Sequence, residues 1–418
     1  MKLIVSSLAA RIAAGVLLAS LATAQTVRYN VTDLGTFGGT LSIPSGINNA
    51  GRVSGGADLP GGEQHPFLTG IAKTDVGTLG GPNGQSYGPN GAGEMAIVSE
   101  MSKPDPLGED FCGFGSHLTC LGAFWNGKMS ALPTLGGTNA MAFAVNNRSQ
   151  LAGVAETGTK DKLCTSPQVL DYQAVMWGPG GEIQALPPLS GDTVGFATLL
   201  NDLGQTVGSS GDCSNTIVST VGALQGPHAV LWENGLATDL GNLGGTMNNV
   251  AYAINNRGEV VGGSNLAGDA SSHAFLWTRD TGMQDIGALG TDAVGAANWI
   301  NNSSQVVGGS CDAMGDCRAF LWQKKVMIDL NSLIPADSPW YLLFACSIND
   351  AGEIVGPAMN KNTGEIHAYL ATPIPVKAGS ASAAAAAQVE PGPLALPENV
   401  RRMLRQRLPF GRPEARPR

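Results

Sequence analysis

One short motif recurs seven times along the chain: an apolar residue or proline, then asparagine, then a tight turn that usually contains glycine. The spacings between successive copies are 42, 56, 55, 54, 46 and 48 residues. The repeated asparagines are Asn48, Asn90, Asn146, Asn201, Asn255, Asn301 and Asn349. Self-similarity at this period is typical of a fold that uses one supersecondary unit again and again. We therefore interpret these asparagines as turn formers and not as catalytic amides.

The copy between residues 251 and 289 contains four short strand-like segments separated by three loops. Asn255 opens the first turn because an asparagine side chain bonds its own backbone, and Gly258 supplies the positive φ that closes it. The segments that follow are rich in β-branched and aromatic residues, which favour strands. No helical period of 3.6 residues is present, so the repeats are not expected to contain helices. The four segments are Ala251–Ile254, Glu259–Gly263, His273–Trp277 and Met283–Gly287.

Four-stranded units of this length are the blades of β-propellers. The third strand of the unit occurs seven times, but only six copies of the fourth strand follow it. The missing copy is found at the start of the chain, in Tyr29–Gly35. The sequence thus predicts an all-β, seven-bladed β-propeller over residues 25–373, closed by an N-terminal strand that completes the last blade. A β-helix is the alternative, although its coils are usually shorter and need no such exchange of ends.

Residues 1–24 have the features of a secretory signal peptide. Lys2 and Arg11 precede an apolar stretch, Ile12–Leu21, and Ala22–Ala24 offers a small-residue cleavage site before Gln25. A membrane anchor is the alternative, but the apolar run is short for one. We expect a secreted protein, extracellular or periplasmic, with no transmembrane segment after removal of the signal.

Export permits disulfides, and the chain has seven cysteines. Six of them fall in loops between second and third strands, at one end of the predicted ring. The expected pairs are Cys112 with Cys120, Cys164 with Cys213, and Cys311 with Cys317, which leaves Cys346 as a buried free thiol. Zinc binding is the competing interpretation, but the pairs lack the Cys-x-x-Cys spacing of zinc sites.

The composition changes after the last repeat. Residues 374–397 are rich in proline and alanine and predict a linker, and residues 398–418 form an Arg-rich tail with net charge +5. Between residues 25 and 396 there are 15 basic and 31 acidic residues, so nucleic acid is not an expected partner. A short amphipathic helix is possible in the tail, with apolar residues at Val400, Met403, Leu404 and Leu408. The tail is either solvated or docked on an anionic polymer, a membrane or the acidic ring.

The repeat resembles the extracellular HAF-repeat family of bacterial proteins, named for the His-Ala-Phe seen here at His273–Phe275. The companion segments Asp239–Gly245 and Ile254–Gly258 match as well, and the resemblance covers residues 29–372. The double glycines Gly262–Gly263 and Gly308–Gly309 are similar to those of kelch repeats. The resemblance implies a secreted, kelch-like propeller, but no activity.

Histidines and tryptophans recur once per repeat. One residue per blade, far from the axis, cannot converge with its equivalents on a single ion, so the histidines are expected to be structural. The tryptophans are expected to pack between blades. The residues concerned are His65, His228, His273 and His367, and Trp125, Trp177, Trp232, Trp277 and Trp322.

The variable parts of a rigid repeat are where function tends to lie. The longest loops between second and third strands occupy residues 100–119, 156–172 and 209–227 and should form a ridge on one face. Acidic and aromatic residues on this ridge suit a polar ligand or a calcium-assisted site, unless the loops only shield the ring. The candidate ligand-binding residues are Asp110, Phe111, Phe114, His117, Asp161 and Asp212.

No nucleophile elbow, phosphate-binding loop or EF-hand motif is present in the sequence. The first strands of the repeats, which should line the channel, are short of acids. The sequence thus favours a secreted, non-catalytic binding module for a glycan or an exported protein, with no catalytic residue, metal or cofactor other than optional calcium. The alternative is a propeller hydrolase or lyase acting on extracellular polysaccharide through paired carboxylates such as Asp110, Asp161 and Asp212. A structural role in an envelope, anchored by the basic tail, is a third possibility.

Overall fold

The computed structural model describes residues 27–219, 224–374 and 394–407. Within these ranges the chain is all-β, as predicted, except for one 3₁₀ turn, η1 (Leu330–Leu333), and one α-helix, α2 (Glu398–Arg407). The predicted signal peptide lies outside the described residues, as do most of the predicted linker (375–393) and the end of the tail (408–418). None of the described helices is both long enough and apolar enough to span a membrane.

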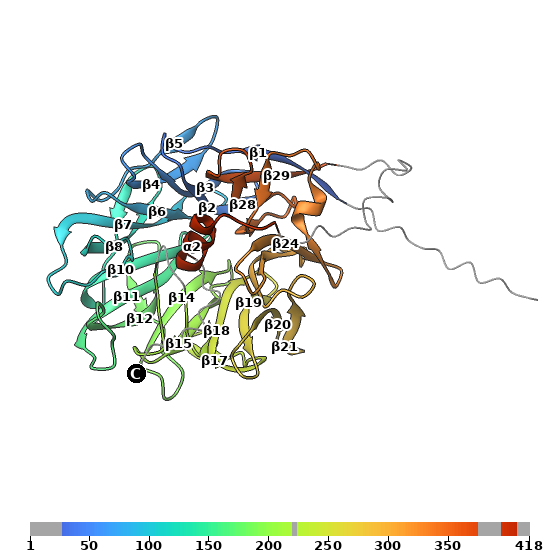
Figure 1. The fold of residues 1–418 in the computed structure, drawn as a ribbon. Helices are drawn as coiled ribbons and strands as arrows, with labels where there is room; N and C mark the ends of the chain where they lie inside the picture. Colours follow the sequence, from blue (N-terminus) through green and yellow to red (C-terminus); the bar gives the residue numbers. More distant parts are fainter. Residues whose placement is uncertain (1–26, 220–223, 375–393, 408–418) are drawn as a thin grey trace, which may run out of the picture.

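The strands form groups of four in which successive strands pair antiparallel. Figure 1 shows these groups arranged around a common centre, as in a propeller. The first sheet has β2 (Ser42–Ile47), β3 (Val53–Asp58), β4 (Gln64–Thr69) and β5 (Lys73–Asp75). The second has β6 (Gly84–Tyr87), β7 (Met95–Pro104), β8 (Leu118–Trp125) and β9 (Met129–Ala131). The third has β10 (Gly136–Val145), β11 (Leu151–Lys160), β12 (Leu170–Trp177) and β13 (Ile183–Ala185).

The next three groups follow the same order. The fourth sheet has β14 (Val194–Leu200), β15 (Thr206–Gly211), β16 (His228–Glu233) and β17 (Leu236–Asp239). The fifth has β18 (Gly244–Ile254), β19 (Val260–Leu266), β20 (Ser272–Thr278) and β21 (Gly282–Gly287). The sixth has β22 (Val294–Ile300), β23 (Val306–Cys311), β24 (Cys317–Gln323) and β25 (Val326–Asp329), and one parallel pair, Ser272 with Val294, joins it to the fifth.

The last sheet combines both ends of the repeat region. It contains β26 (Trp340–Leu342), β27 (Ser347–Ile348), β28 (Ile354–Asn360) and β29 (Ile366–Ile374), and its outer strand is β1 (Arg28–Asp33). β1 pairs antiparallel with β29 over six residues, from Arg28 opposite Ile374 to Asp33 opposite Tyr369. Tyr29 of β1 is buried in the core of this sheet.

The histidine that opens the third strand of a sheet binds an aspartate, so its role is structural as predicted. His65 Nδ1 lies 2.8 Å from Asp75 of β5, and His273 Nδ1 lies 2.8 Å from Asp285 of β21. His367 of β29 makes the same contact with Asp33 of β1, at 3.0 Å. β1 therefore occupies the place that a fourth strand occupies in the other sheets.

In the sixth sheet an arginine takes the place of the histidine. Arg318 of β24 lies 3.2 Å from both Asp292 and Asp329, and all three side chains are buried. The contact with Asp329 of β25 joins the third and fourth strands as the pairs of His65, His273 and His367 do, whereas His228 of the fourth sheet binds Asp192 before the first strand, at 2.9 Å.

The repeated asparagines close the turns and also join neighbouring sheets. In each copy Oδ1 accepts the backbone N–H groups two and four residues on; in the fifth sheet Asn255 Oδ1 accepts from Arg257 at 2.9 Å and Glu259 at 3.0 Å. Nδ2 of each donates to the backbone carbonyl of the next asparagine, 42, 56, 55, 54, 46 and 48 residues away. Asn349 donates in turn to the carbonyl of Asn48, 301 residues away, at 3.0 Å. These hydrogen bonds thus link the seven repeated asparagines into one continuous series, in the order of the repeats.

Five of the first strands carry a β-bulge at the third residue before the repeated asparagine. A β-bulge changes the direction in which a side chain points. Here the second strand of the sheet comes close to the first strand beside the bulge. A Cβ on Gly153, Gly208, Gly262 or Gly308 would collide with a carbonyl oxygen of that first strand. In the second sheet Ile97 stands at the corresponding place, and β6 pairs with β7 without a bulge. The first glycine of each double-glycine pair, Gly262 and Gly308, is therefore explained by this close approach.

Tryptophans at the ends of third strands pack between sheets, as predicted. Trp177 and Trp232 are fully buried, and their Nε1 atoms donate to the carbonyls of Pro133 at 2.9 Å and Pro187 at 2.6 Å. Each of these carbonyls belongs to the segment that joins the fourth strand of the preceding sheet to the first strand of the sheet that holds the tryptophan. The apolar clusters likewise combine residues of adjacent sheets.

Candidate functional site

A central cavity of about 460 Å³ runs along the first strands of the sheets. Each of the seven repeat copies contributes to its wall the residue that stands three positions before its repeated asparagine. Where a bulge is present, it is this residue that the bulge displaces from the strand register. The seven wall residues are Ser45, Tyr87, Phe143, Thr198, Tyr252, Asn298 and Cys346. A volume of this size is within the range of small-molecule sites.

The wall of the cavity combines aromatic and neutral polar groups. Tyr87 and Phe143 meet edge to face, with ring centroids 5.4 Å apart, and Tyr252 and Trp299 also line the cavity. Burial raises the pKa of both tyrosines, Tyr87 and Tyr252, so their hydroxyls stay neutral. Among the described residues that line the cavity, Asp202 and Asp350 are the charged ones.

Asp202 and Asp350 lie at the turn end of the cavity and are committed to hydrogen bonds. Asp202 accepts from the backbone and side chain of Asn147 and from Asn256, each at 2.9 Å. Burial alone would raise the pKa of Asp202, but these hydrogen bonds outweigh it and lower the pKa. Asp350 is bonded in the same way by Asn302 and Asn49, and its pKa is also lowered. Both carboxylates hold the rim together and are not free to act as bases.

Helix α2 lies at the opposite end of the cavity. Leu404 of α2 contributes to the cavity lining, and Figure 1 shows α2 over the centre of the ring of sheets. Val400 and Leu404 are buried against the body, which confirms the predicted amphipathic helix. Of the alternatives for the tail, its described part docks on the chain's own ring.

Cys346 is a free thiol on the cavity wall, partly exposed to the cavity. Its surroundings raise the pKa of the thiol to about 12, because burial disfavours the thiolate. The other six cysteines form the three predicted disulfides, Cys112–Cys120, Cys164–Cys213 and Cys311–Cys317.

The first predicted loop is more buried than its composition indicates. Phe111 is only 3% exposed and packs edge to face on Tyr172, with centroids 6.0 Å apart, while Phe114 is half-buried in the same cluster. Asp110 accepts from the N–H of Gly115 at 3.0 Å, within its own turn. His117 is exposed and bonds the carbonyl of Gly108 at 2.8 Å. Phe111 is thus a core residue and does not offer its ring at the surface.

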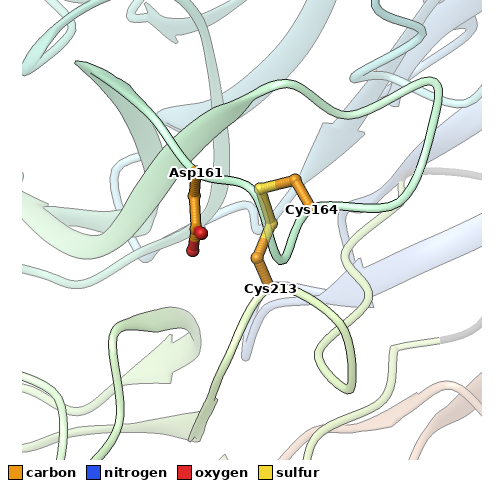
Figure 2. A group of neighbouring side chains, drawn as sticks. All are labelled: Asp161, Cys164 and Cys213. Carbon is orange, nitrogen blue, oxygen red and sulfur yellow. A yellow bond between two sulfur atoms is a disulfide. The ribbon is translucent and has the colours of Figure 1, made fainter.

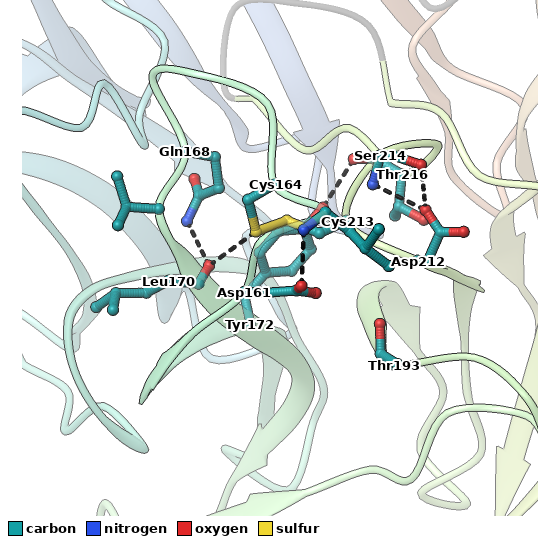
Figure 3. Close-up of a disulfide and its surroundings, with 12 residues drawn as sticks. Asp161, Cys164, Gln168, Leu170, Tyr172, Thr193, Asp212, Cys213, Ser214 and Thr216 are labelled. Carbon is teal, nitrogen blue, oxygen red and sulfur yellow. Dashed lines mark hydrogen bonds between the residues drawn. A yellow bond between two sulfur atoms is a disulfide. The ribbon is translucent and has the colours of Figure 1, made fainter.

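Asp161 and Asp212 lie on either side of the Cys164–Cys213 disulfide, which joins the loops of the third and fourth sheets (Figures 2 and 3). Each organises its own loop: Asp161 accepts from the N–H of Leu163 and Asp212 from that of Ser214, both at 2.8 Å. Burial, and then the charge and hydrogen bond of Asp161, raise the pKa of Asp171 to about 6. The disulfide therefore does bring two of the predicted acidic residues to one place.

The Asp161 oxygen and the sulfurs of Cys164 and Cys213 lie within 4.8 Å of one another, the spacing of metal ligands (Figure 2). The two sulfurs are bonded to each other, however, so no thiolate is present to bind zinc. The predicted calcium dependence of this face stays a prediction.

The sequence analysis missed a buried carboxyl pair between the second and third sheets. Glu109 and Glu156 are fully buried, and Nε2 of Gln168 lies 3.2 Å from Oε1 of Glu109 and 2.9 Å from Oε1 of Glu156. Oε2 of Glu156 accepts from the N–H of Asn139 at 2.9 Å. The signal available in the sequence was only that Glu109 stands in the first long loop and Glu156 at the start of the second. Because both groups are enclosed, neither reaches a substrate.

The pair makes a testable contribution to stability. Burial, followed by the charge of Glu109, raises the pKa of Glu156 to about 7, so the folded state holds a proton that the unfolded state releases near pH 4.5. The resulting stability is fully present below about pH 4.5 and is lost as the pH rises to about 7, with a loss of about 3 kcal/mol. Because the pKa values of Glu109 and Asp171 are also raised, denaturant unfolding of Glu156→Gln should show a smaller decline between pH 5 and 7.5, whereas exposed Glu63→Gln should retain the full decline. An unchanged decline in Glu156→Gln would contradict the assignment.

Comparison with known proteins finds only distant structural similarity. No protein-family profile matches the chain, and no curated protein matches it. Among solved structures, the acylaminoacyl peptidase of Pyrococcus horikoshii is similar at 12% identity and TM-score 0.47, over 82% of this chain and 54% of that one. A puromycin hydrolase is similar at 12% identity and TM-score 0.46, over 80% and 56%. A mutant of the Aleuria aurantia lectin in complex with Fucα1-6GlcNAc is similar at 9% identity and TM-score 0.33, over 85% and 98%. The chain thus spans little more than half the length of the two hydrolases.

Proposed function

We propose that the protein is a secreted, closed seven-bladed β-propeller that binds a neutral, partly apolar ligand, such as a glycan, in its central cavity. The observation that carries this proposal is the chemistry of the cavity wall. Aromatic rings from Tyr87, Phe143 and Tyr252 face a space that also presents the neutral polar side chains of Ser45 and Asn298. Aromatic faces combined with a few hydrogen-bonding groups suit a sugar ring, and the lack of free charge disfavours ionic ligands.

Seven blades and closure by β1 are supported by the asparagine contacts and by the pairing of β1 with β29. Secretion is supported by the signal-like residues 1–24 and agrees with three disulfides, which persist in oxidising compartments. Kinship with HAF-repeat proteins is supported by the motif residues of β20, His273 and Phe275.

A hydrolase is the second candidate, and the raised pKa of Asp171 beside Asp161 is the observation in its favour. Glycosidases need two carboxyl groups at least about 5 Å apart, with the sugar between them. Asp161 and Asp171 instead lie close enough for the charge of Asp161 to raise the pKa of Asp171, and Glu109 and Glu156 are enclosed. The arrangement of acids therefore favours binding over catalysis.

Binding to an array of neutral bacterial and plant polysaccharides, with calcium and with chelator, tests the proposal. For the oligosaccharide that binds best, Tyr252→Ala is expected to weaken affinity at least about tenfold in calorimetric titration, because a stacking face in the wall is lost. Phe114→Ala and Asp161→Asn serve as controls in the predicted loop ridge and should leave affinity unchanged. Loss of binding in these two variants but not in Tyr252→Ala would move the site to the ridge. Absence of binding to every polysaccharide would shift the proposal to a protein partner.

A further inference from the structure

Helix α2 is attached to the body through one carboxylate. Asp316 accepts from Nε of Arg401 at 2.7 Å, from Nη2 of Arg401 at 2.9 Å and from the backbone N–H of Leu396 at 2.8 Å. A bidentate arginine–carboxylate contact of this kind fixes orientation as well as position. The side chain of Asp316 is 7% exposed, so the contact is largely shielded from solvent.

The anchor is itself held rigidly. Asp316 precedes Cys317 in the short loop closed by the Cys311–Cys317 disulfide, and its backbone N–H donates to Asp312 at 2.9 Å. The hydroxyl of Tyr341 accepts the backbone N–H of Leu394 at 3.1 Å and so holds the segment that leads into the helix. The receiving surface is therefore preformed by the sixth and seventh sheets.

The apolar face of α2 is continuous with the cavity wall. Leu396, Val400 and Leu404 form one buried cluster with residues of the sixth and seventh sheets, including Phe344. Phe344 and Leu404 also line the central cavity. The same side chains thus both dock the helix and complete the wall.

Docking of α2 differs in kind from the packing of the sheets. No strand of the described chain pairs with the segment 394–407. A ten-residue helix is only marginally stable by itself in water, so α2 forms because it is docked. Release of α2 therefore breaks no strand pairing of the described chain, whereas opening the ring between β1 and β29 would.

We propose that α2 is a releasable plug that closes one end of the central cavity, with Arg401 and Asp316 as its latch. In this arrangement the C-terminal segment controls access to the proposed ligand site and competes with a ligand entering from that end. The role of the plug in ligand access rests on the proposed function, but closure of the cavity by α2 can be measured without any ligand.

Cys346 provides the measurement, because it is a free thiol on the cavity wall while the other six cysteines are in disulfides. The rate at which a maleimide labels Cys346 in the complete mature chain, at one fixed pH, reports access to the cavity. Arg401→Gln is expected to speed labelling on the order of fivefold, since a bidentate charged contact is lost. A double variant, Val400→Asp with Leu404→Asp, should speed it more than about tenfold, because it places two charges against apolar side chains.

Arg402→Gln is the matched control: it makes the same change on the next, exposed residue of α2 and should label at the rate of the natural chain. Thermal unfolding separates opening of the cavity from global instability, because release of the plug should leave the main transition in place. If the double variant does not fold, Arg401→Gln decides the question. Equal labelling rates for Arg401→Gln, Arg402→Gln and the natural chain would overturn the plug. Faster labelling of Arg401→Gln without any polysaccharide binding would keep the plug and reject the glycan site.

Discussion

Replacement of Asn255 by alanine is expected to lower the free energy of unfolding by about 3–5 kcal/mol. The side chain is 5% exposed and makes four hydrogen bonds. Its Oδ1 holds two N–H groups of its turn, and its Nδ2 donates to Glu259 at 2.5 Å and to the carbonyl of Asn301 at 3.1 Å. Alanine would remove three part-buried hydrogen bonds within the turn and leave the buried carbonyl of Asn301 unsatisfied across the junction of two sheets. Guanidinium unfolding at neutral pH measures the loss.

The neighbouring Asn256→Ala provides the control for this variant. Asn256 is exposed, and its amide bonds Asp202 at the rim, at 2.9 Å. Water can replace a contact at an exposed site, so the expected loss is at most about 1.5 kcal/mol. If both variants lose the same stability, the buried contact between sheets is not what makes the repeated asparagine important.

Tyr29→Ala is also expected to lower the free energy of unfolding by about 3–5 kcal/mol, as measured by thermal or denaturant unfolding. Tyr29 is 1% exposed and stands in β1, where it packs into the core of the last sheet. Removing the ring creates a cavity at the place where the two ends of the repeat region meet. Proteolysis should then cut first at β1 or β29, because their pairing joins the ends.

Tyr29→Phe is the matched control, since it keeps the aromatic ring and should stay within about 1 kcal/mol of the natural chain. An alanine variant as stable as the phenylalanine variant would show that β1 is dispensable, and closure of the ring by β1 would then be wrong.

The main features of the fold could be predicted because they depend on local patterns. The asparagine turns and β-branched segments of each copy are encoded within a few residues, and the count of third and fourth strands assigned the outer strand to the N-terminus. The contact of His367 with Asp33 reproduces that of His273 with Asp285, although the sequence analysis did not predict aspartate as the partner of these histidines. The disulfides followed from loop positions for the same reason.

The site was harder to predict because it depends on strand register. Tyr87, Phe143 and Tyr252 stand at one position of the repeat but differ in their neighbours, and only alignment on the repeated asparagine shows that they share a wall. Phe111 stands in a segment that has the composition of a surface loop, yet the ring of Tyr172, from a distant segment, packs against it. The pairing of Glu109 with Glu156 also depends on two loops meeting, which no local pattern encodes.

The asparagine contacts have a consequence for how freely the chain can be reorganised. The contact from Asn349 to Asn48 is equivalent to the six that join consecutive copies, so the ring of contacts does not distinguish the ends of the chain from its middle. The order of the sheets around the ring therefore does not depend on which two neighbouring sheets the chain leaves unconnected. Circular permutants with new termini in an exposed loop between second and third strands should keep every asparagine contact, provided that β1 stays joined to β29.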